Sequence, residues 1–264
     1  MHIKTLFVGI SLFSFVCCCS CSQSSTIGDP MVVPEKILQG TTSLSYYIRD
    51  YLRLSESYNA YDTALHKISR EEFLKQLTSG EYLPLRLSTR DSSNNYKLYK
   101  VPEYADTDIR SMLKYYIGET YYNFYKREGQ KLPGFNYVDL NGNVYNEATT
   151  KGKIVVLKCW FIRCTVCIQE MPQLNELVQQ YSARKDIVFV SLANDSAEDL
   201  TSFLQKKTFN YVVVPNMETY MSEELKIKAY PTHFIINKQG LISKVTSSAA
   251  ELAVALQEAA IKND

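Results

Sequence analysis

Residues 153–172 read KIVVLKCWFIRCTVCIQEMP, and this stretch decides how the rest of the chain is organised. Its first part, Ile154–Phe161, is apolar and rich in β-branched residues, which predicts a buried strand. From Cys164 onward, apolar residues recur at helical spacing: Ile168, Met171, Leu174, Leu177, Val178 and Tyr181. The pair Cys164 and Cys167 therefore lies at a junction between a strand and a helix.

The position of the two cysteines predicts redox chemistry. Unpaired N–H groups and the positive end of the helix dipole favour a thiolate at a helix start, which lowers the pKa of Cys164. Arg163, directly before it, adds positive charge. We expect Cys164 to be the attacking thiol and Cys167 the resolving one, because two intervening residues let the sulfurs meet and cycle between dithiol and disulfide.

Two other uses of the cysteine pair remain open. A zinc site needs more ligands, and outside residues 1–21 the chain offers only Cys159, His66 and His233 beyond the pair. A purely structural disulfide is the second alternative, although a bond that closes so short a loop gains little loop-closure entropy. We therefore expect no metal and no cofactor.

The residues that flank the pair carry a resemblance to a known family. Trp160 precedes the cysteines, Glu170-Met171-Pro172 follows them, and Tyr230-Pro231-Thr232 leads into a predicted strand that ends at Asn237. In this combination the chain resembles the TlpA/ResA-like thiol–disulfide oxidoreductases, which are membrane-anchored and have the thioredoxin-like fold. The similarity runs from Leu132 to the carboxyl terminus.

The resemblance implies roles for individual residues. It makes Cys164 and Cys167 the redox pair that forms a disulfide, and Pro231 a cis-proline facing that pair. It implies that Tyr230, before the cis-proline, presents its backbone to an extended substrate chain. It also implies that Pro172 kinks the active-site helix.

Other polar residues near the pair allow more than one interpretation. By the resemblance, Lys158 takes the place of a buried acid in thioredoxin. In one interpretation it lies beneath the redox pair. In the other, its side chain reaches water or pairs with Glu170. Glu170 relays protons to the thiol or is an ordinary solvated carboxylate. Cys159 should lie on the strand face opposite Lys158 and Trp160, as a buried apolar residue. His233 is a candidate general base only.

The amino-terminal residues predict a lipoprotein. Residues 1–20 hold one early lysine and an apolar run, Leu6–Val16, typical of a secretory signal. A small residue before a cysteine resembles the lipobox, so we expect lipid on Cys21, with Cys19 as second choice, and a domain facing the periplasm. A secreted protein without lipid is the alternative. Residues 21–40, with serines and prolines, predict a flexible tether.

Residues 41–130 form a tyrosine-rich region without cysteine, and we expect this region to be mainly helical. Its aromatic residues are more typical of a core than of a ligand-binding surface. Ser69 with Glu72 fits a capping box. The predicted helices are Ser43–Ser57, Ser69–Ser79 and Asp106–Glu128, and the predicted strands are Tyr82–Leu87 and Tyr96–Val101.

Residues 131–264 predict an α/β domain, whose central sheet is covered on both faces and ends in an antiparallel hairpin. Asp195 and Asp199 are expected at the start of one of its helices. Besides the strand that precedes the cysteines and the helix that follows them, the predicted strands are Phe135–Asp139, Val144–Asn146, Ile187–Ala193, Tyr211–Val214, Thr232–Asn237 and Leu241–Val245. The predicted helices are Ala197–Lys207, Ser222–Ile227 and Ala249–Ile261.

Charge and motif together predict the function. The 29 basic and 28 acidic side chains nearly balance, which gives no reason to expect nucleic-acid binding. We expect a periplasmic, lipid-anchored thiol–disulfide oxidoreductase that reduces disulfides of substrate proteins and, by resemblance, receives electrons from a membrane thiol conduit. The alternatives are a thiol peroxidase, although the Pro and Thr of that family are missing before Cys164, and a binding lipoprotein with a structural disulfide.

Overall fold

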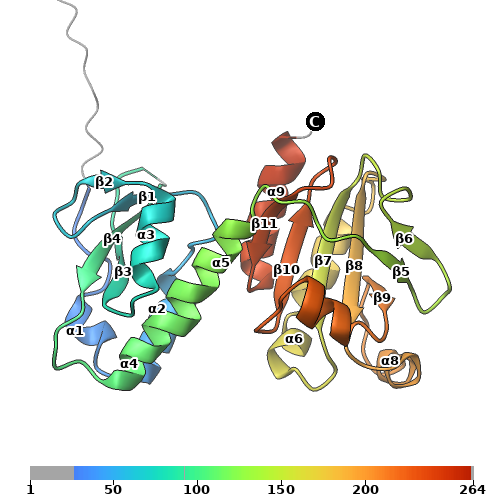
Figure 1. Ribbon diagram of the computed structural model, residues 1–264, viewed down its shortest axis with the longest axis horizontal. Coiled ribbons are helices and arrows are strands. Elements are labelled where there is room, and N and C mark those ends of the chain that lie inside the picture. Colours follow the sequence, from blue (N-terminus) through green and yellow to red (C-terminus); the bar gives the residue numbers. More distant parts are fainter. Residues whose placement is uncertain (1–26, 92, 263–264) are drawn as a thin grey trace, which may run out of the picture.

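The computed structural model describes residues 27–262 apart from Ser92, and two packed regions lie side by side in it, joined through helix α5 (Thr120–Arg127) (Figure 1). The predicted signal segment, with Cys19 and Cys21, lies outside the described residues. Within the described part of the chain, no helix combines the length and the apolar composition that a membrane span requires.

The amino-terminal region is built on a mixed sheet with strand order β2-β1-β4-β3. Strands β1 and β4 are parallel, and the other neighbours are antiparallel. The prediction of a mainly helical region is therefore wrong, because β1 and β2 are too short to show an alternating pattern. The strands are β1 (Tyr58–Tyr61), β2 (Lys67–Ile68), β3 (Tyr82–Leu87) and β4 (Asn94–Lys100).

Helices pack against this sheet. The helix predicted from Ser43 to Ser57 is α2 and ends at Tyr51, and Ser69 caps α3 by accepting a hydrogen bond from the backbone N–H of Glu72 at 3.1 Å. The long predicted helix is present but contains a π-helical segment, η1. The elements are α2 (Thr41–Tyr51), α3 (Arg70–Leu77), α4 (Thr107–Met112), η1 (Leu113–Glu119) and α5.

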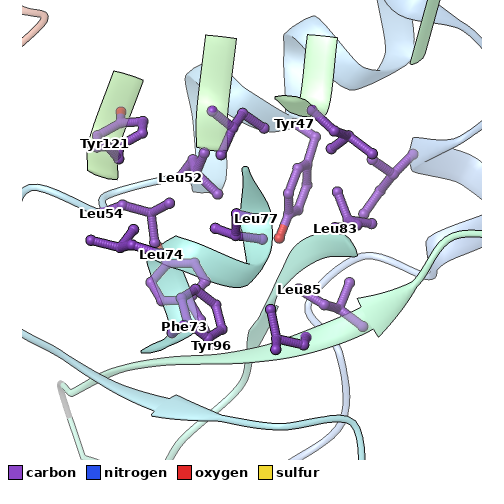
Figure 2. Packing of buried hydrophobic residues seen from close by; sticks show 14 of the residues in the cluster. Tyr47, Leu52, Leu54, Phe73, Leu74, Leu77, Leu83, Leu85, Tyr96 and Tyr121 are labelled. Carbon is purple, nitrogen blue, oxygen red and sulfur yellow. The ribbon is translucent and has the colours of Figure 1, made fainter. Parts of the chain in front are cut away.

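Leucine and aromatic side chains from both layers form the core of the amino-terminal region (Figure 2). Tyr47 from α2 reaches the sheet, where its hydroxyl donates to the carbonyl oxygen of Pro84 at 2.8 Å and accepts from the N–H of Arg86 at 2.7 Å. This pairing lets a buried hydroxyl remain satisfied. Of the aromatic residues expected in the core, Tyr121 is buried, whereas Tyr116 is 71% exposed.

Residues 28–38 differ from the flexible tether expected there. The N–H of Met31 donates to the carbonyl oxygen of Arg86 at 3.0 Å, and Pro30 forms a bridge with Leu87, so the segment follows the edge of β3. It then forms the short helix α1 (Pro34–Ile37), and Ile37 is buried in the core. Its prolines, Pro30 and Pro34, helped to indicate a tether, but Ile37 and the free edge of β3 hold the segment in place.

The carboxyl-terminal region has a central sheet with strand order β11-β10-β7-β8-β9. Strands β7, β8 and β9 are parallel, and β10 and β11 are antiparallel to their neighbours, as the sequence predicts. The strands are β7 (Ile154–Trp160), β8 (Ile187–Ala193), β9 (Val212–Val214), β10 (Thr232–Ile236) and β11 (Ile242–Thr246). This order and the flanking helices give a thioredoxin-like α/β fold.

Both faces of this sheet are covered. Helices α7 (Met171–Gln180) and α9 (Ala249–Lys262) pack on one face. The hairpin of β5 (Asn136–Val138) and β6 (Val144–Asn146) and the π-helical turn η2 (Tyr220–Glu224) pack on the other. Alternate residues of β7 point to the two faces, which separates Val155, Leu157 and Cys159 from Ile154, Val156 and Trp160.

The connection between the two regions is itself part of the sheet. Gly129 donates its N–H to the carbonyl oxygen of Ile242 at 2.8 Å, and Ile242 returns a bond of the same length to Gln130. Lys131 then forms a bridge with Leu241. Residues 129–131 therefore extend the sheet beyond β11 instead of forming a free hinge.

Candidate active site

The loop after β7, the central strand of the sheet, places Cys164 beyond the carboxyl end of that strand, where it is the N-cap of helix α6 (Thr165–Gln169). Its sulfur accepts a hydrogen bond from the N–H of Cys167 at 3.3 Å. A sulfur that faces the unpaired N–H groups of a helix start is stabilised as a thiolate. Cys164 is 9% exposed and Cys167 is fully buried, so only the first cysteine keeps some contact with solvent.

Cys164 and Cys167 form a disulfide bond, with a sulfur–sulfur distance of 2.06 Å. The structure therefore represents the oxidised state of the pair. Helix α6 continues through Glu170 into α7, which begins with Met171-Pro172, so Pro172 takes one of the first positions of a helix, where its missing N–H is not needed.

The segment before β10 lies beside the redox pair. The peptide bond between Tyr230 and Pro231 is cis, as the resemblance implies. Strand β10 pairs Thr232 with Cys159 of β7, which brings the preceding proline next to the end of β7. The ring of Tyr230 packs edge-on against Phe161, in the loop before Cys164, with 5.2 Å between ring centroids.

A buried charge cluster lies beneath Cys167. Lys158 of β7 and His233 of β10 are directly paired residues of neighbouring strands, and both are fully buried. The ammonium of Lys158 forms an ion pair with Glu170 and donates to the carbonyl oxygen of Cys167 at 3.3 Å. The imidazole Nε2 of His233 lies 3.1 Å from the same carboxylate oxygen of Glu170.

Burial and mutual attraction act against each other in this cluster. Burial lowers the pKa of Lys158 and of His233, because it disfavours their charged forms, and the nearby Glu170 acts in the opposite direction. Burial alone would raise the pKa of Glu170, but His233 and Lys158 hold it below its usual value. Glu170 therefore remains a carboxylate between two basic groups.

The cluster answers two questions that the sequence left open. Glu170 is not a solvated helix carboxylate, since its side chain is 9% exposed and its second oxygen accepts from the N–H of Ala249 at 3.0 Å. Lys158 pairs with Glu170 and also contacts the backbone of the redox pair, so both interpretations of Lys158 hold in part. The contact with Ala249, at the start of α9, carries no signal in the sequence.

The loop before Cys164 has a partner that sequence reasoning missed. Asp195 accepts a hydrogen bond from the N–H of Ile162 at 2.8 Å. The N-cap of helix α8 (Ala197–Leu204) is Ser196, whose side chain accepts from the N–H of Asp199. Asp195, directly before this N-cap, lies at the helix start that the sequence predicts and in addition positions the active-site loop.

Two further predicted residues flank the pair on different sides. Trp160 is fully buried against Phe203 and Phe209, where it supports the loop from below. Arg163 is exposed and borders a hollow of about 490 Å³, whose lining includes Lys206. Trp160 thus belongs to the core beneath the site, and Arg163 to its surface.

Cys159 is not brought to the redox pair. It is buried on the opposite face of β7, as the alternation predicts, and burial raises the pKa of its thiol. His66 is exposed in the amino-terminal region, where its Nδ1 lies 3.1 Å from a carboxylate oxygen of Asp62. Within residues 27–262, leaving Ser92 aside, no group of three or more His, Cys, Asp or Glu side chains is arranged to hold a metal ion.

Part of this chain is similar to known proteins. Residues 129–245 match the AhpC/TSA family. The thioredoxin-like protein YneN of Bacillus subtilis is 27% identical over 142 residues, which cover 51% of this chain and 83% of YneN. The thiol–disulfide oxidoreductase ResA of Bacillus cereus is 30% identical over 115 residues, which cover 43% of this chain and 66% of ResA.

Solved structures are also similar. The crystal structure of a putative thiol:disulfide interchange protein DsbE from Chlorobium tepidum covers 52% of this chain and 96% of its own, with a TM-score of 0.46 and 23% identity. The exposed lipoprotein thioredoxin Etrx1 from Streptococcus pneumoniae covers 47% of this chain and 98% of its own, with a TM-score of 0.42 and 22% identity.

Proposed function

We propose that this chain, a thioredoxin-like thiol–disulfide oxidoreductase of the AhpC/TSA type and similar to ResA, reduces disulfide bonds of other proteins with Cys164 and Cys167. The observation that carries the proposal is the difference in exposure within the pair. Cys164, at a helix start, is 9% exposed, and Cys167 is fully buried behind it. A substrate sulfur can therefore meet Cys164 first.

The reaction proceeds in two exchanges. The Cys164 thiolate attacks a substrate disulfide; a mixed disulfide forms, and the first substrate sulfur leaves as a thiolate that takes up a proton. The Cys167 thiolate then attacks the Cys164 sulfur, which releases the second substrate sulfur and leaves the Cys164–Cys167 disulfide. Two electrons have passed to the substrate, and a dithiol of a membrane thiol conduit then reduces the Cys164–Cys167 disulfide by the same kind of exchange and is itself oxidised to a disulfide.

The surface around Cys164 supports a protein substrate. Val166, between the two cysteines, is 57% exposed, and Ile162 and Tyr230 are half-buried beside them. An apolar rim of this kind favours contact with an extended or unfolded chain, whose apolar side chains are accessible. The site therefore suits a polypeptide that carries apolar residues next to its disulfide.

We also propose that the protein is anchored to the membrane by lipid on Cys21 and faces the periplasm. The support is the apolar leader and the small residue before Cys21. An anchor would keep the redox domain close to a membrane-bound electron donor, which raises the effective concentration of each for the other.

Reduction of insulin by dithiothreitol tests the proposed function. The wild-type protein should accelerate the reaction, and Cys164→Ser should abolish the acceleration. A rate equal to that of dithiothreitol alone would favour a binding lipoprotein with a structural disulfide. Consumption of hydrogen peroxide at the expense of the dithiol, without insulin reduction, would favour a thiol peroxidase.

A further inference from the structure

A side chain of the amino-terminal region, that of Arg127, contacts the carboxyl-terminal region. Arg127 is the last residue of α5, and its Nη2 donates a hydrogen bond to the carbonyl oxygen of Leu225 in the carboxyl-terminal region. Its guanidinium carbon also lies over the ring of Phe234, 5.4 Å from the ring centroid. Arg127 is half-buried between the two regions, so both contacts are partly shielded from water.

The carbonyl that Arg127 binds belongs to the segment that leads to the cis-proline. Leu225 ends the turn η2, and its side chain is buried. Carbonyl groups at the end of a helical turn lack partners within it, and a cation is a favourable partner for them. After Leu225 the chain turns at Lys226, whose φ is +48°, and runs without regular structure to Tyr230-Pro231.

The ring over which Arg127 lies belongs to β10, the strand that follows this segment. Phe234 follows Pro231 by three residues and is fully buried in β10. One guanidinium thus contacts the chain both before and after the cis Tyr230–Pro231 bond. We propose that Arg127 is a positioning residue for the proposed reduction of protein disulfides, through which the amino-terminal region holds the substrate-facing segment 225–231 in place.

The inference rests on the proposed function and makes a specific distinction between substrates. In the role that the resemblance implies for Tyr230, a protein disulfide aligns its chain with the backbone of this residue before Cys164 attacks. A small aromatic disulfide such as 5,5′-dithiobis(2-nitrobenzoate) needs only an accessible Cys164. Loss of the support from Arg127 should therefore slow the reduction of protein disulfides and leave the reduction of the small disulfide unchanged.

The experiment compares rate constants of the reduced full-length protein for insulin and for the small disulfide. In Arg127→Met the rate constant for insulin should fall about fivefold, as expected when a charge-assisted hydrogen bond that orders a loop is lost, and that for the small disulfide should stay within about twofold. Arg127→Lys, which keeps a cation and a donor, should recover part of the loss.

Lys244→Met is the matched control. Lys244 lies on β11 and is ion-paired at 3.2 Å with Glu128, the residue after Arg127, so its loss also weakens the contact between the regions. It does not belong to segment 225–231, and the insulin rate should stay at the wild-type value. An equal loss in Lys244→Met, an equal loss for both disulfides in Arg127→Met, or wild-type rates in both Arg127 variants would overturn the inference. A wild-type protein that reduces neither disulfide would instead refute the proposed function.

Discussion

Lys158 and Glu170 form an ion pair in the interior of the protein, directly beneath the resolving cysteine. The Lys158 side chain is fully buried, Glu170 is 9% exposed, and the lysine also donates to the carbonyl oxygen of Cys167. At this depth electrostatic interactions are weakly screened, so a change of either charge reaches the Cys167 sulfur. The charges of Lys158 and Glu170 therefore influence the stability of the reduced redox pair.

Lys158→Met should make the reduction potential of the pair more negative. Without the ammonium, the carboxylate of Glu170 remains near Cys167, and the pKa of the Cys167 thiol rises in the reduced protein. The reduced form loses stabilisation, so we expect a shift of roughly 30 mV, which corresponds to about 1.4 kcal/mol for a two-electron couple. Equilibration with glutathione measures the potential. The control Lys206→Met removes an exposed lysine near the same site, and equal potentials in all three proteins would show that Glu170 fully neutralises Lys158.

Cys167→Ser should accumulate covalent complexes with substrates through Cys164. The mixed disulfide forms normally, but no second thiolate is available to resolve it. Non-reducing electrophoresis after exposure to oxidised insulin should show the adduct, and reductant should remove it. Cys164→Ser is the control and should give none; an adduct in that variant and none in Cys167→Ser would reverse the assigned roles, and equal yields would show that the two cysteines are not distinguished.

Glu251→Gln should weaken the pH dependence of stability. The carboxylate of Glu251 is buried between the two regions, where it accepts from the hydroxyl of Tyr121 at 3.0 Å and from the N–H of Ser247 at 3.2 Å. Burial raises its pKa, so the folded state holds its proton more tightly than the unfolded state. Stability is then lost as the pH rises from the unfolded pKa through the folded pKa.

The glutamine keeps the acceptor for Tyr121 but cannot ionise. The drop in melting temperature that this group causes as the pH rises above the unfolded pKa of a glutamate, about 4.3, should therefore be absent in Glu251→Gln. Glu258→Gln, on the same helix, is the control and should follow the wild-type profile. Identical profiles in all three proteins would contradict a role of Glu251 in this dependence.

Gly118→Ala should destabilise the amino-terminal region. A Cβ at Gly118, in η1, would lie 2.3 Å from the carbonyl oxygen of Leu77, so the contact between η1 and α3 would have to open. Overpacking of this kind costs about 1–3 kcal/mol. Urea unfolding measures it, with Gly134→Ala as the control, because a Cβ there would meet no atom within 4 Å. Equal midpoints in both variants would speak against the tight contact.

Cys21→Ser should release the protein from membranes. A serine cannot carry the thioether-linked lipid, and without acyl chains the protein loses its proposed anchor. Fractionation of cells and uptake of labelled fatty acid measure the change. Cys19→Ser serves as the comparison: release by that variant alone would move the lipid to Cys19, and membrane association of both without label would refute the lipoprotein proposal.

The carboxyl-terminal fold was more predictable than the amino-terminal one. Strand β8 has the predicted bounds, Ile187–Ala193, because buried parallel strands are dense in β-branched residues. In the amino-terminal region, β1 has four residues and pairs in parallel with β4, which is distant in the sequence. Such pairing depends on contacts between distant segments, and no local pattern indicates it.

The active site, like the fold, could be predicted from the sequence only in part. The sequence pointed to Cys164 and Cys167, because their chemistry depends on residue type and spacing. The proximity of His233 to Lys158 required the register between β10 and β7. The contacts of Glu170 with Ala249 and of Arg127 with Leu225 involve backbone groups, which every residue possesses, so no residue type in the sequence indicates them.

The pairing of residues 129–131 with β11 affects where the chain can be cut into separate fragments. A cut at the predicted boundary near Lys131 would remove the strand partner of Ile242 and leave its N–H and C=O groups open to solvent. An uncovered sheet edge is a template on which another chain can add a strand. A fragment that begins at Lys131 should therefore self-associate, and a fragment that begins before Gly129 should remain monomeric.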